Sequence, residues 1–394
     1  MATINLRRYS EPDALKEFSP DILIALMDEN REFLATKGVV LPQSGDGTEL
    51  DYETLALVFL SPDDIPQPLV EKFHLVKQMS SMEAMDTILD TVKERELPIV
   101  FAPNSTPQDI AAQLLLKSRE VFHELHADKA TARYRGFTYF VGEPLPDFVM
   151  PTDFKALESR LNDWYEPHQR GRTAKVMCRQ KDSKFWIYVR HAEPIRREGC
   201  VGMTDNKSGS MIYRPERHDL VLFDPEAGEM GVHCDCKDEP ELFRQAFGLH
   251  LCNDKDFFPP SRQKYTLEPL KKKQRKALNC VGIRGLDSIK LKELDYETPG
   301  ETWAKWRIQA SDVFKVLEND GESIPEDADL KQAKFAVKFK DAKRARTVIV
   351  RPSNYAQVGR DDDALIMDEF FKRQGFVLAN EDGQENGDGA VAES

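Results

Sequence analysis

The stretch His218–Lys237, which reads HDLVLFDPEAGEMGVHCDCK, decides the fold class. Turn-forming residues at Asp224–Gly228 separate two segments with a period of two, a pattern typical of an antiparallel hairpin. The expected register places Asp219 opposite His233. Side chains alternate between the two faces of a strand. The expected core face consists of Leu220, Leu222, Met230, Val232, Cys234 and Cys236. The expected polar face consists of Arg217, Asp219, His233, Asp235 and Lys237.

The segments on either side of this hairpin extend the pattern. Lys175–Arg179 and Phe185–Arg190 flank a turn and predict a second hairpin. Ser210–Tyr213 and Glu229–Cys236 then continue a meander of strands. A helix, Pro240–Leu251, is expected to pack on the resulting sheet.

The residues before Gly136 have a helical pattern instead. Ser19 and Pro20 mark a helix start, because serine caps the first free amides and proline suits the first helical position. The longest predicted helix runs from Ser105 to about Tyr134. A short strand, Phe137–Val141, follows it.

The C-terminal third mixes strands and helices and ends in a segment rich in Glu, Asp and Gly. The sequence therefore predicts an α+β protein: a helical N-terminal domain, a mostly antiparallel sheet domain and a smaller mixed α/β C-terminal region. The expected divisions are a helical domain at 1–145, an antiparallel sheet domain with flanking helices at 146–270, a mixed domain at 271–379 and a disordered acidic tail at 380–394.

Composition narrows the class of protein. The 394 residues are 40% hydrophobic and 31% charged, which is typical of a globular chain. No apolar run approaches the roughly 20 residues that span a bilayer. Arg7 and Arg8 are followed by no apolar stretch, so we expect no secretory signal. Six cysteines are too few for a disulfide framework at this length. We expect a cytoplasmic protein with reduced thiols and no membrane partner.

The net charge of −13 hides basic stretches in the second half of the chain. Clusters of lysine and arginine bind phosphate backbones without base specificity, although they can also form a solvated face or dock on an acidic domain. The candidate nucleic-acid-binding residues are Lys271, Lys272, Lys273, Arg275, Lys276, Lys343, Arg344 and Arg346.

The hairpin resembles the PD-(D/E)xK nuclease superfamily in one respect. Asp219 on one strand and Asp235-Cys236-Lys237 on its neighbour match a carboxylate followed by acid-x-Lys. The resemblance implies that Asp219 and Asp235 hold Mg²⁺, that Lys237 orients the attacking water, and that Glu158 supplies the helical glutamate. The competing interpretation is a hairpin with one solvated, charged face.

Other motifs are incomplete. His233-Cys234-Asp235-Cys236 lacks a second ligand pair with zinc spacing, although Cys200 or Cys252 could contribute. His123 and His126 are one residue too close for the zincin motif. Gly282-Ile-Arg-Gly285 lacks the remaining glycine of a phosphate loop.

The interpretation favoured by the sequence is a non-enzymatic interaction subunit, with no cofactor, that works beside other protein subunits and touches nucleic acid. Thr106–Gln113 and Arg351–Tyr355 resemble stretches of uncharacterised bacterial proteins, some from anti-phage defence loci. The alternatives are an Mg²⁺-dependent nuclease at Asp219, Asp235 and Lys237, and an adaptor that binds only protein.

Overall fold

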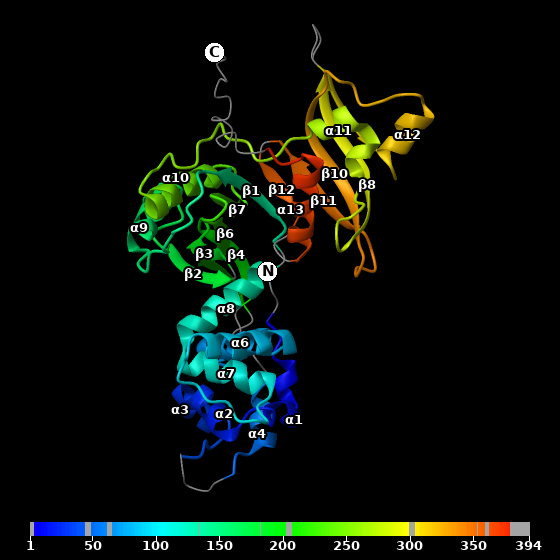
Figure 1. Ribbon diagram of the computed structural model, residues 1–394. Coiled ribbons are helices and arrows are strands. Elements are labelled where there is room, and N and C mark those ends of the chain that lie inside the picture. Colours follow the sequence, from blue (N-terminus) through cyan, green and yellow to red (C-terminus); the bar gives the residue numbers. More distant parts are fainter. Residues whose placement is uncertain are drawn as a thin grey trace, which may run out of the picture. The chain divides into compact units, whose positions relative to one another are not determined.

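The protein is described by a computed structural model that covers residues 4–43, 49–60, 65–132, 134–181, 183–201, 207–298, 304–352, 354–358 and 362–378 (Figure 1). The predicted acidic tail at 380–394 lies outside the described residues. The chain divides into two units, each described here by itself: 1–132 with 193–215, and 133–192 with 216–394.

The first unit contains the predicted helical region. Its helices are η1 (Arg7–Ser10), α1 (Pro12–Leu15), α2 (Pro20–Met27), η2 (Asp28–Asn30), α3 (Arg31–Thr36), α4 (Tyr52–Val58), α5 (Gln67–Gln78), α6 (Met82–Glu94), α7 (Pro107–Lys117) and α8 (Arg119–Thr131). Asp51, Ser81 and Thr106 each accept the backbone N–H three residues ahead and so cap α4, α6 and α7. Ser19 precedes α2 as predicted, but its side chain makes no capping hydrogen bond. The core of the unit includes buried rings of Tyr9 and Phe73, 4.9 Å apart and edge to face.

One predicted helix of this region is wrong in its length. The helix expected at Ser105–Tyr134 is two helices, α7 and α8, which meet at Ser118. Ser118 has backbone angles outside the helical region (φ −148°, ψ 72°), which are incompatible with a continuous α-helix, and its N–H donates to the Leu114 carbonyl at 2.8 Å. The break gives α8 a direction of its own.

A two-stranded hairpin also belongs to the first unit, although it lies far along the chain. Strands β4 (Arg196–Val201) and β5 (Ser208–Tyr213) pair only with each other among the described strands. The prediction that Ser210–Tyr213 continues the main meander is therefore wrong. In the main sheet β3 pairs directly with β6, because the chain between them forms this separate hairpin.

The second unit is built on one ten-stranded sheet in which every pair of neighbours is antiparallel. The order across the sheet is β2-β3-β6-β7-β1-β12-β11-β10-β8-β9. The strands are β1 (Gly136–Val141), β2 (Lys175–Lys181), β3 (Lys184–Ala192), β6 (Glu216–Asp224), β7 (Glu229–His233), β8 (Leu286–Thr298), β9 (Ala304–Gln309), β10 (Asp329–Phe339), β11 (Arg346–Arg351) and β12 (Tyr355–Gln357). Together with the helices they form an α+β protein.

Strand β1 joins the two halves of this sheet. It pairs with β7 on one side, through Thr138 opposite Val232, and with β12 on the other, through Gly136 opposite Gln357. The segments 146–270 and 271–379 thus share one sheet while each builds a hydrophobic core of its own. Their division into separate domains stays a prediction.

Helices cover the two halves separately (Figure 1). Helices α9 (Lys155–Tyr165) and α10 (Glu239–Cys252) pack on β2, β3, β6 and β7. Helices α11 (Glu268–Lys273), η4 (Gln274–Leu278), α12 (Val313–Asn319) and α13 (Asp362–Gln374) belong to the core formed with β8, β10 and β11. Within the described residues, no helix is both long and apolar enough to cross a membrane.

Candidate functional site

The register of the β6–β7 hairpin differs by one residue from the expected one. Leu220, and not Asp219, lies opposite His233, and Asp224 lies opposite Glu229. A shift of one residue in an antiparallel pair moves side chains to the other face. The core face is formed by Val221, Phe223, Met230 and Val232.

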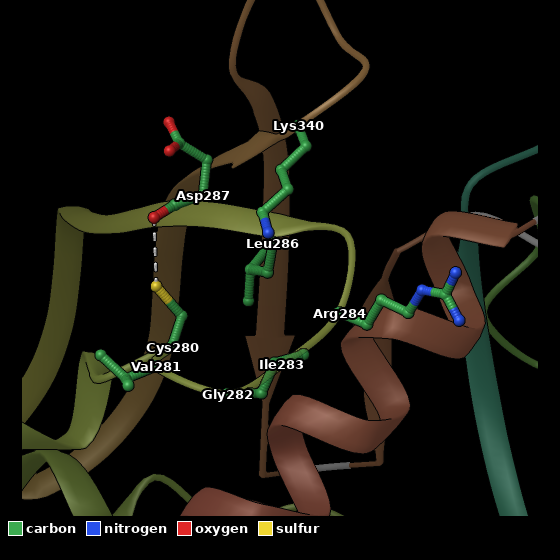
Figure 2. Close-up of a pocket in the computed structure, with 8 residues that line it drawn as sticks. All are labelled: Cys280, Val281, Gly282, Ile283, Arg284, Leu286, Asp287 and Lys340. Carbon is green, nitrogen blue, oxygen red and sulfur yellow. Dashed lines mark hydrogen bonds between the residues drawn. The ribbon is translucent and has the colours of Figure 1, made fainter.

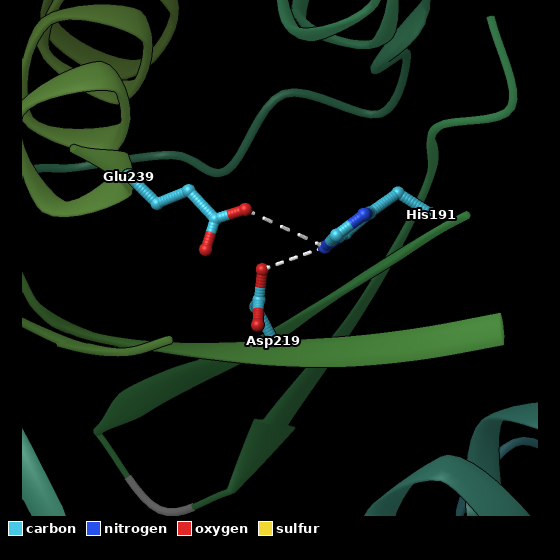
Figure 3. Close-up of side chains that lie close together, drawn as sticks. All are labelled: His191, Asp219 and Glu239. Atoms are coloured by element: carbon cyan, nitrogen blue, oxygen red, sulfur yellow. Dashed lines mark hydrogen bonds and ion pairs between the residues drawn. The ribbon is translucent and has the colours of Figure 1, made fainter. Parts of the chain in front are cut away.

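Asp219 therefore points into the core and is fully buried, with 0% exposure. There its Oδ2 lies 2.9 Å from Nε2 of His191, the penultimate residue of β3. Glu239, the first residue of α10, places its Oε1 4.0 Å from the same nitrogen. Figure 3 shows the three side chains converging from β3, β6 and the start of α10. We call His191, Asp219 and Glu239 the buried triad.

The atoms of the triad that face away from its centre have partners of their own. His191 Nδ1 lies 3.0 Å from the Ala192 carbonyl, which requires a proton on Nδ1. The Cys236 backbone N–H donates to Glu239 Oε2 at 3.3 Å. Arg217 Nε donates to Asp219 Oδ1 at 3.4 Å. The triad is thus held from three sides.

Two further side chains border the triad. Arg170 donates to Glu239 Oε1 and lies over the ring of Tyr165, 5.5 Å from its centre. Tyr165 stacks on the His191 ring with 4.4 Å between ring centres. Tyr165 is fully buried, and its hydroxyl has no hydrogen-bond partner among the described residues.

Burial dominates the electrostatics of this centre. Desolvation, followed by the charge of Asp219, raises the pKa of Glu239, and Arg170 acts against this shift. Burial and the two carboxylates also raise the pKa of Tyr165 and that of Cys234. The phenol and the thiol are therefore neutral across the physiological range.

The residues predicted for a nuclease site lie in different surroundings. Asp235 follows β7 in a bend, with its side chain 65% exposed, and pairs with Arg217. Arg217 is the link between Asp235 and the buried Asp219. Lys237 is exposed and pairs with no carboxylate among the described residues. The structure thus groups Asp219 with His191 and Glu239, and the metal-binding role of Asp235 stays a prediction.

The other side chains named from motifs have local roles. Glu158 accepts the Val176 N–H at 3.0 Å and pairs with Lys175, so it anchors the start of β2. His233 bonds the Gly136 carbonyl and stacks on Tyr134. All six cysteines are free thiols.

The histidines of α8 also have local partners. His123 accepts a hydrogen bond from Arg119, and His126 bonds Gln78. Across the described residues, the buried triad is the group of three or more potential ligands that could hold a metal ion.

The predicted nucleic-acid-binding residues fall into two groups. Four are engaged in internal contacts: Lys271 with Glu268 and the Ala328 carbonyl, Lys273 with the Gln374 carbonyl, Arg275 with Glu318 and Asp312, and Arg346 with Asp363. The other four are exposed, and no described residue pairs with them: Lys272, Lys276, Lys343 and Arg344. We call this second group the free cations.

A surface pocket of about 420 Å³ lies between the segments that carry the free cations. It is lined by Cys280–Arg284, Leu286, Asp287 and Lys340 (Figure 2). The Lys340 N–H donates to the Gly285 carbonyl at 2.9 Å and ties the β10–β11 turn to this loop. In Figure 2 the Lys340 side chain extends towards Leu286, whereas Arg284 points away from the loop.

Sequence reasoning missed His191 and Glu239. His191 lies 28 residues before Asp219, and neither residue forms a motif with it. The available signal was the strand alternation: Asp219 shares its face with Val221 and Phe223, which belong to the core.

Comparison with known proteins does not identify a family for this chain. No protein-family model and no curated protein sequence matches the chain.

Proposed function

We propose that the chain is a non-enzymatic interaction subunit that contacts nucleic acid through the free cations of its C-terminal region. The observation that carries this proposal is the exposure of Lys272, Lys276, Lys343 and Arg344 without an acidic partner in the described part of the chain. Such cations displace the counterions condensed on phosphate backbones, which favours binding without base specificity.

A backbone hydrogen bond joins two of the segments that carry these cations. Lys276 precedes the loop that lines the pocket, and Lys343 and Arg344 follow Lys340 in the turn tied to that loop. Lys340 and Arg284 add positive charge along the pocket. The carboxylates of Asp287 and Asp341 lie among the cations and reduce the local positive charge, but they are fewer than the cations.

The burial of Asp219 supports the non-enzymatic part of the proposal. A catalytic carboxylate must lie within hydrogen-bond reach of its substrate or of the water it activates. Asp219 is fully buried and already bonded to His191 and Arg217. The proposal also includes a cytoplasmic location and the bacterial defence context that the resemblance of Thr106–Gln113 indicates.

The test is the salt dependence of binding to labelled duplex DNA and single-stranded RNA, measured by fluorescence anisotropy. Each cation that neutralises a phosphate contributes about 0.9 to the slope of log K against log salt on duplex DNA, and about 0.7 on single strands. The variant K272Q/K276Q/K343Q/R344Q should therefore lose about 3–4 from the slope on duplex DNA.

A matched control removes the same charge from the first unit. Arg7, Lys93, Arg197 and Arg214 are exposed and pair with no acid within the described ranges. The variant R7Q/K93Q/R197Q/R214Q should leave the slope unchanged. The proposal is contradicted by equal losses in the two variants, or by absence of binding by the intact protein at low salt.

A second candidate is the adaptor that binds only protein, and the β4–β5 hairpin favours it. Both strands are almost wholly exposed, and they carry large apolar side chains, with Met211 52% and Ile212 68% exposed. Photo-crosslinking residues at positions 212 and 343 separate the candidates. Adducts with nucleic acid from position 343 support the main proposal, whereas adducts with protein alone from both positions support the adaptor.

A further inference from the structure

Three atoms with lone pairs converge at the centre of the buried triad. His191, Asp219 and Glu239 each offer one ligand atom, and these atoms lie within 4.8 Å of one another; Nε2 of His191 is 2.9 Å from Asp219 Oδ2 and 4.0 Å from Glu239 Oε1 (Figure 3). Nδ1 of His191 donates to the Ala192 carbonyl, so an imidazole with a single proton would present a lone pair at Nε2. The repulsion between lone pairs in such proximity is offset by a proton or by a bound cation.

A proton on Nε2 satisfies only part of this centre. It can bridge the 2.9 Å to Asp219, but the 4.0 Å to Glu239 exceeds hydrogen-bond reach. A divalent ion has bonds of about 2.0–2.2 Å to nitrogen and oxygen, so two of its ligands can lie up to about 4.4 Å apart. Both separations from Nε2 fall within that limit.

The contacts around the triad match the outer shell of a metal site. Metal-binding histidines donate their other N–H to a carbonyl or carboxylate, and metal-binding carboxylates accept hydrogen bonds at their outer oxygen. His191 donates to Ala192, Asp219 Oδ1 accepts from Arg217, and Glu239 Oε2 accepts from the Cys236 amide. In each of the three side chains, the second nitrogen or oxygen atom faces the centre of the triad.

Tyr165 is an independent observation at the same place. Its ring stacks on His191, it is fully buried, and its hydroxyl finds no acceptor or donor among the described residues. Buried hydroxyls usually have a partner. A water bound to an ion in the triad would provide one.

Arg170 acts against an ion, because it donates to Glu239 Oε1, the oxygen that faces the centre. Metal binding therefore has to share or displace this contact. This competition predicts the direction in which metal affinity changes. Removal of Arg170 should strengthen metal binding, whereas removal of a ligand should weaken it.

We propose that His191, Asp219 and Glu239 bind one divalent transition-metal ion in a buried site that ties the N-terminus of α10 to β3 and β6 and leaves a coordination position for water. One imidazole and two carboxylates suit Zn²⁺, Fe²⁺ or Mn²⁺. The site is separate from the free cations, and its existence does not depend on nucleic-acid binding.

The test measures binding of Zn²⁺, and of Mn²⁺ in parallel, to the full chain purified without a histidine tag. Equilibrium dialysis followed by elemental analysis should give one ion per chain. H191Q and E239Q should lower the affinity at least about 100-fold, more than a typical outer-shell change. R170Q should raise it, because the variant frees Glu239 Oε1. D235N should leave it unchanged, because Asp235 is exposed and outside the triad.

Free thiols could bind Zn²⁺ instead, so C234S/C236S is the matched control and should retain the ion. Absence of saturable binding to the wild type, or binding lost in C234S/C236S and retained in H191Q, overturns the proposal. X-ray absorption of the wild-type Zn²⁺ complex decides the matter if H191Q or E239Q does not fold. A shell of nitrogen and oxygen supports the triad, and a shell dominated by sulfur refutes it.

Discussion

Replacement of Asp219 by alanine tests whether the buried triad stabilises the second unit. The substitution removes the partner of His191 and one of the two carboxylates paired with Arg217, in a centre where Asp219 and His191 are about 0–1% exposed. Removal of one partner from a buried ionic pair costs about 3–5 kcal/mol, because the other is left without compensation. We expect D219A to lower the free energy of unfolding of this unit by that amount.

The matched variant is D235A. Asp235 contacts the same arginine but is largely exposed, and an exposed ion pair contributes about 0–1 kcal/mol. The two substitutions remove the same functional group on either side of Arg217, so the difference between them measures burial. We expect a difference of about 2–4 kcal/mol.

Urea unfolding followed by tryptophan fluorescence measures this difference without interference from the helical unit. The four tryptophans are Trp164, Trp186, Trp303 and Trp306, and all fall in the sequence of the second unit. A cost below about 1 kcal/mol for D219A, or equal costs for the two variants, would refute the reasoning and indicate that water reaches the triad.

Three further predictions follow from other contacts. Burial raises the pKa of Cys252 to about 12, so at pH 8 its thiol should be alkylated far more slowly than the exposed Cys200, as peptide mass spectrometry can measure. Gly228 has φ +65° and a backbone carbonyl 2.4 Å from the position of an added Cβ, so G228A should lower the melting temperature, whereas G199A, with open space around it, should not. Wild-type protein with Mg²⁺ should cleave neither DNA nor RNA; cleavage that is lost in D235A would instead establish the nuclease.

The elements that the sequence predicts well are those fixed by neighbouring residues. The start of α7 follows from Thr106, which caps it, and Pro107, which occupies its first position. The β2–β3 hairpin follows from two alternating segments around a short turn, and its strands pair from Lys175 opposite Arg190 to Lys181 opposite Lys184. In each case the signal and the structure lie within a few residues of each other.

Pairings between distant segments could not be predicted in this way. Gly136 lies opposite Gln357, and nothing in the local pattern of either strand selects the other. The chain between β3 and β6 has strand-like residues on both sides of its turn, yet it pairs with itself and leaves the main sheet. Such choices depend on the packing of whole surfaces, which a period of two does not encode.

The register of β6 was ambiguous for a physical reason. Leu220–Phe223 is a run of four apolar residues, so both faces of the strand bear apolar side chains, and alternation does not say which face meets the helices. In the structure Leu220 is buried on one face, and Val221 and Phe223 join the core with α9 and α10 on the other. Because side chains alternate along the strand, Asp219 lies on the same face as Val221. This placement brings the carboxylate to His191 and Glu239.

This register also constrains any chemistry at Asp219. Asp219 is fully buried, and Glu239 in the first turn of α10 is one of the groups that would have to move before a substrate reached the carboxylate. Such a movement would break the contacts of Glu239 with Arg170 and with the Cys236 amide, and would leave Arg170 without its carboxylate. The contacts that close the centre hold the first turn of α10, whereas Phe243, Phe247 and Leu251 pack the rest of the helix into the core. Opening the centre therefore breaks the polar contacts of that first turn, which favours a structural role for Asp219 over a catalytic one.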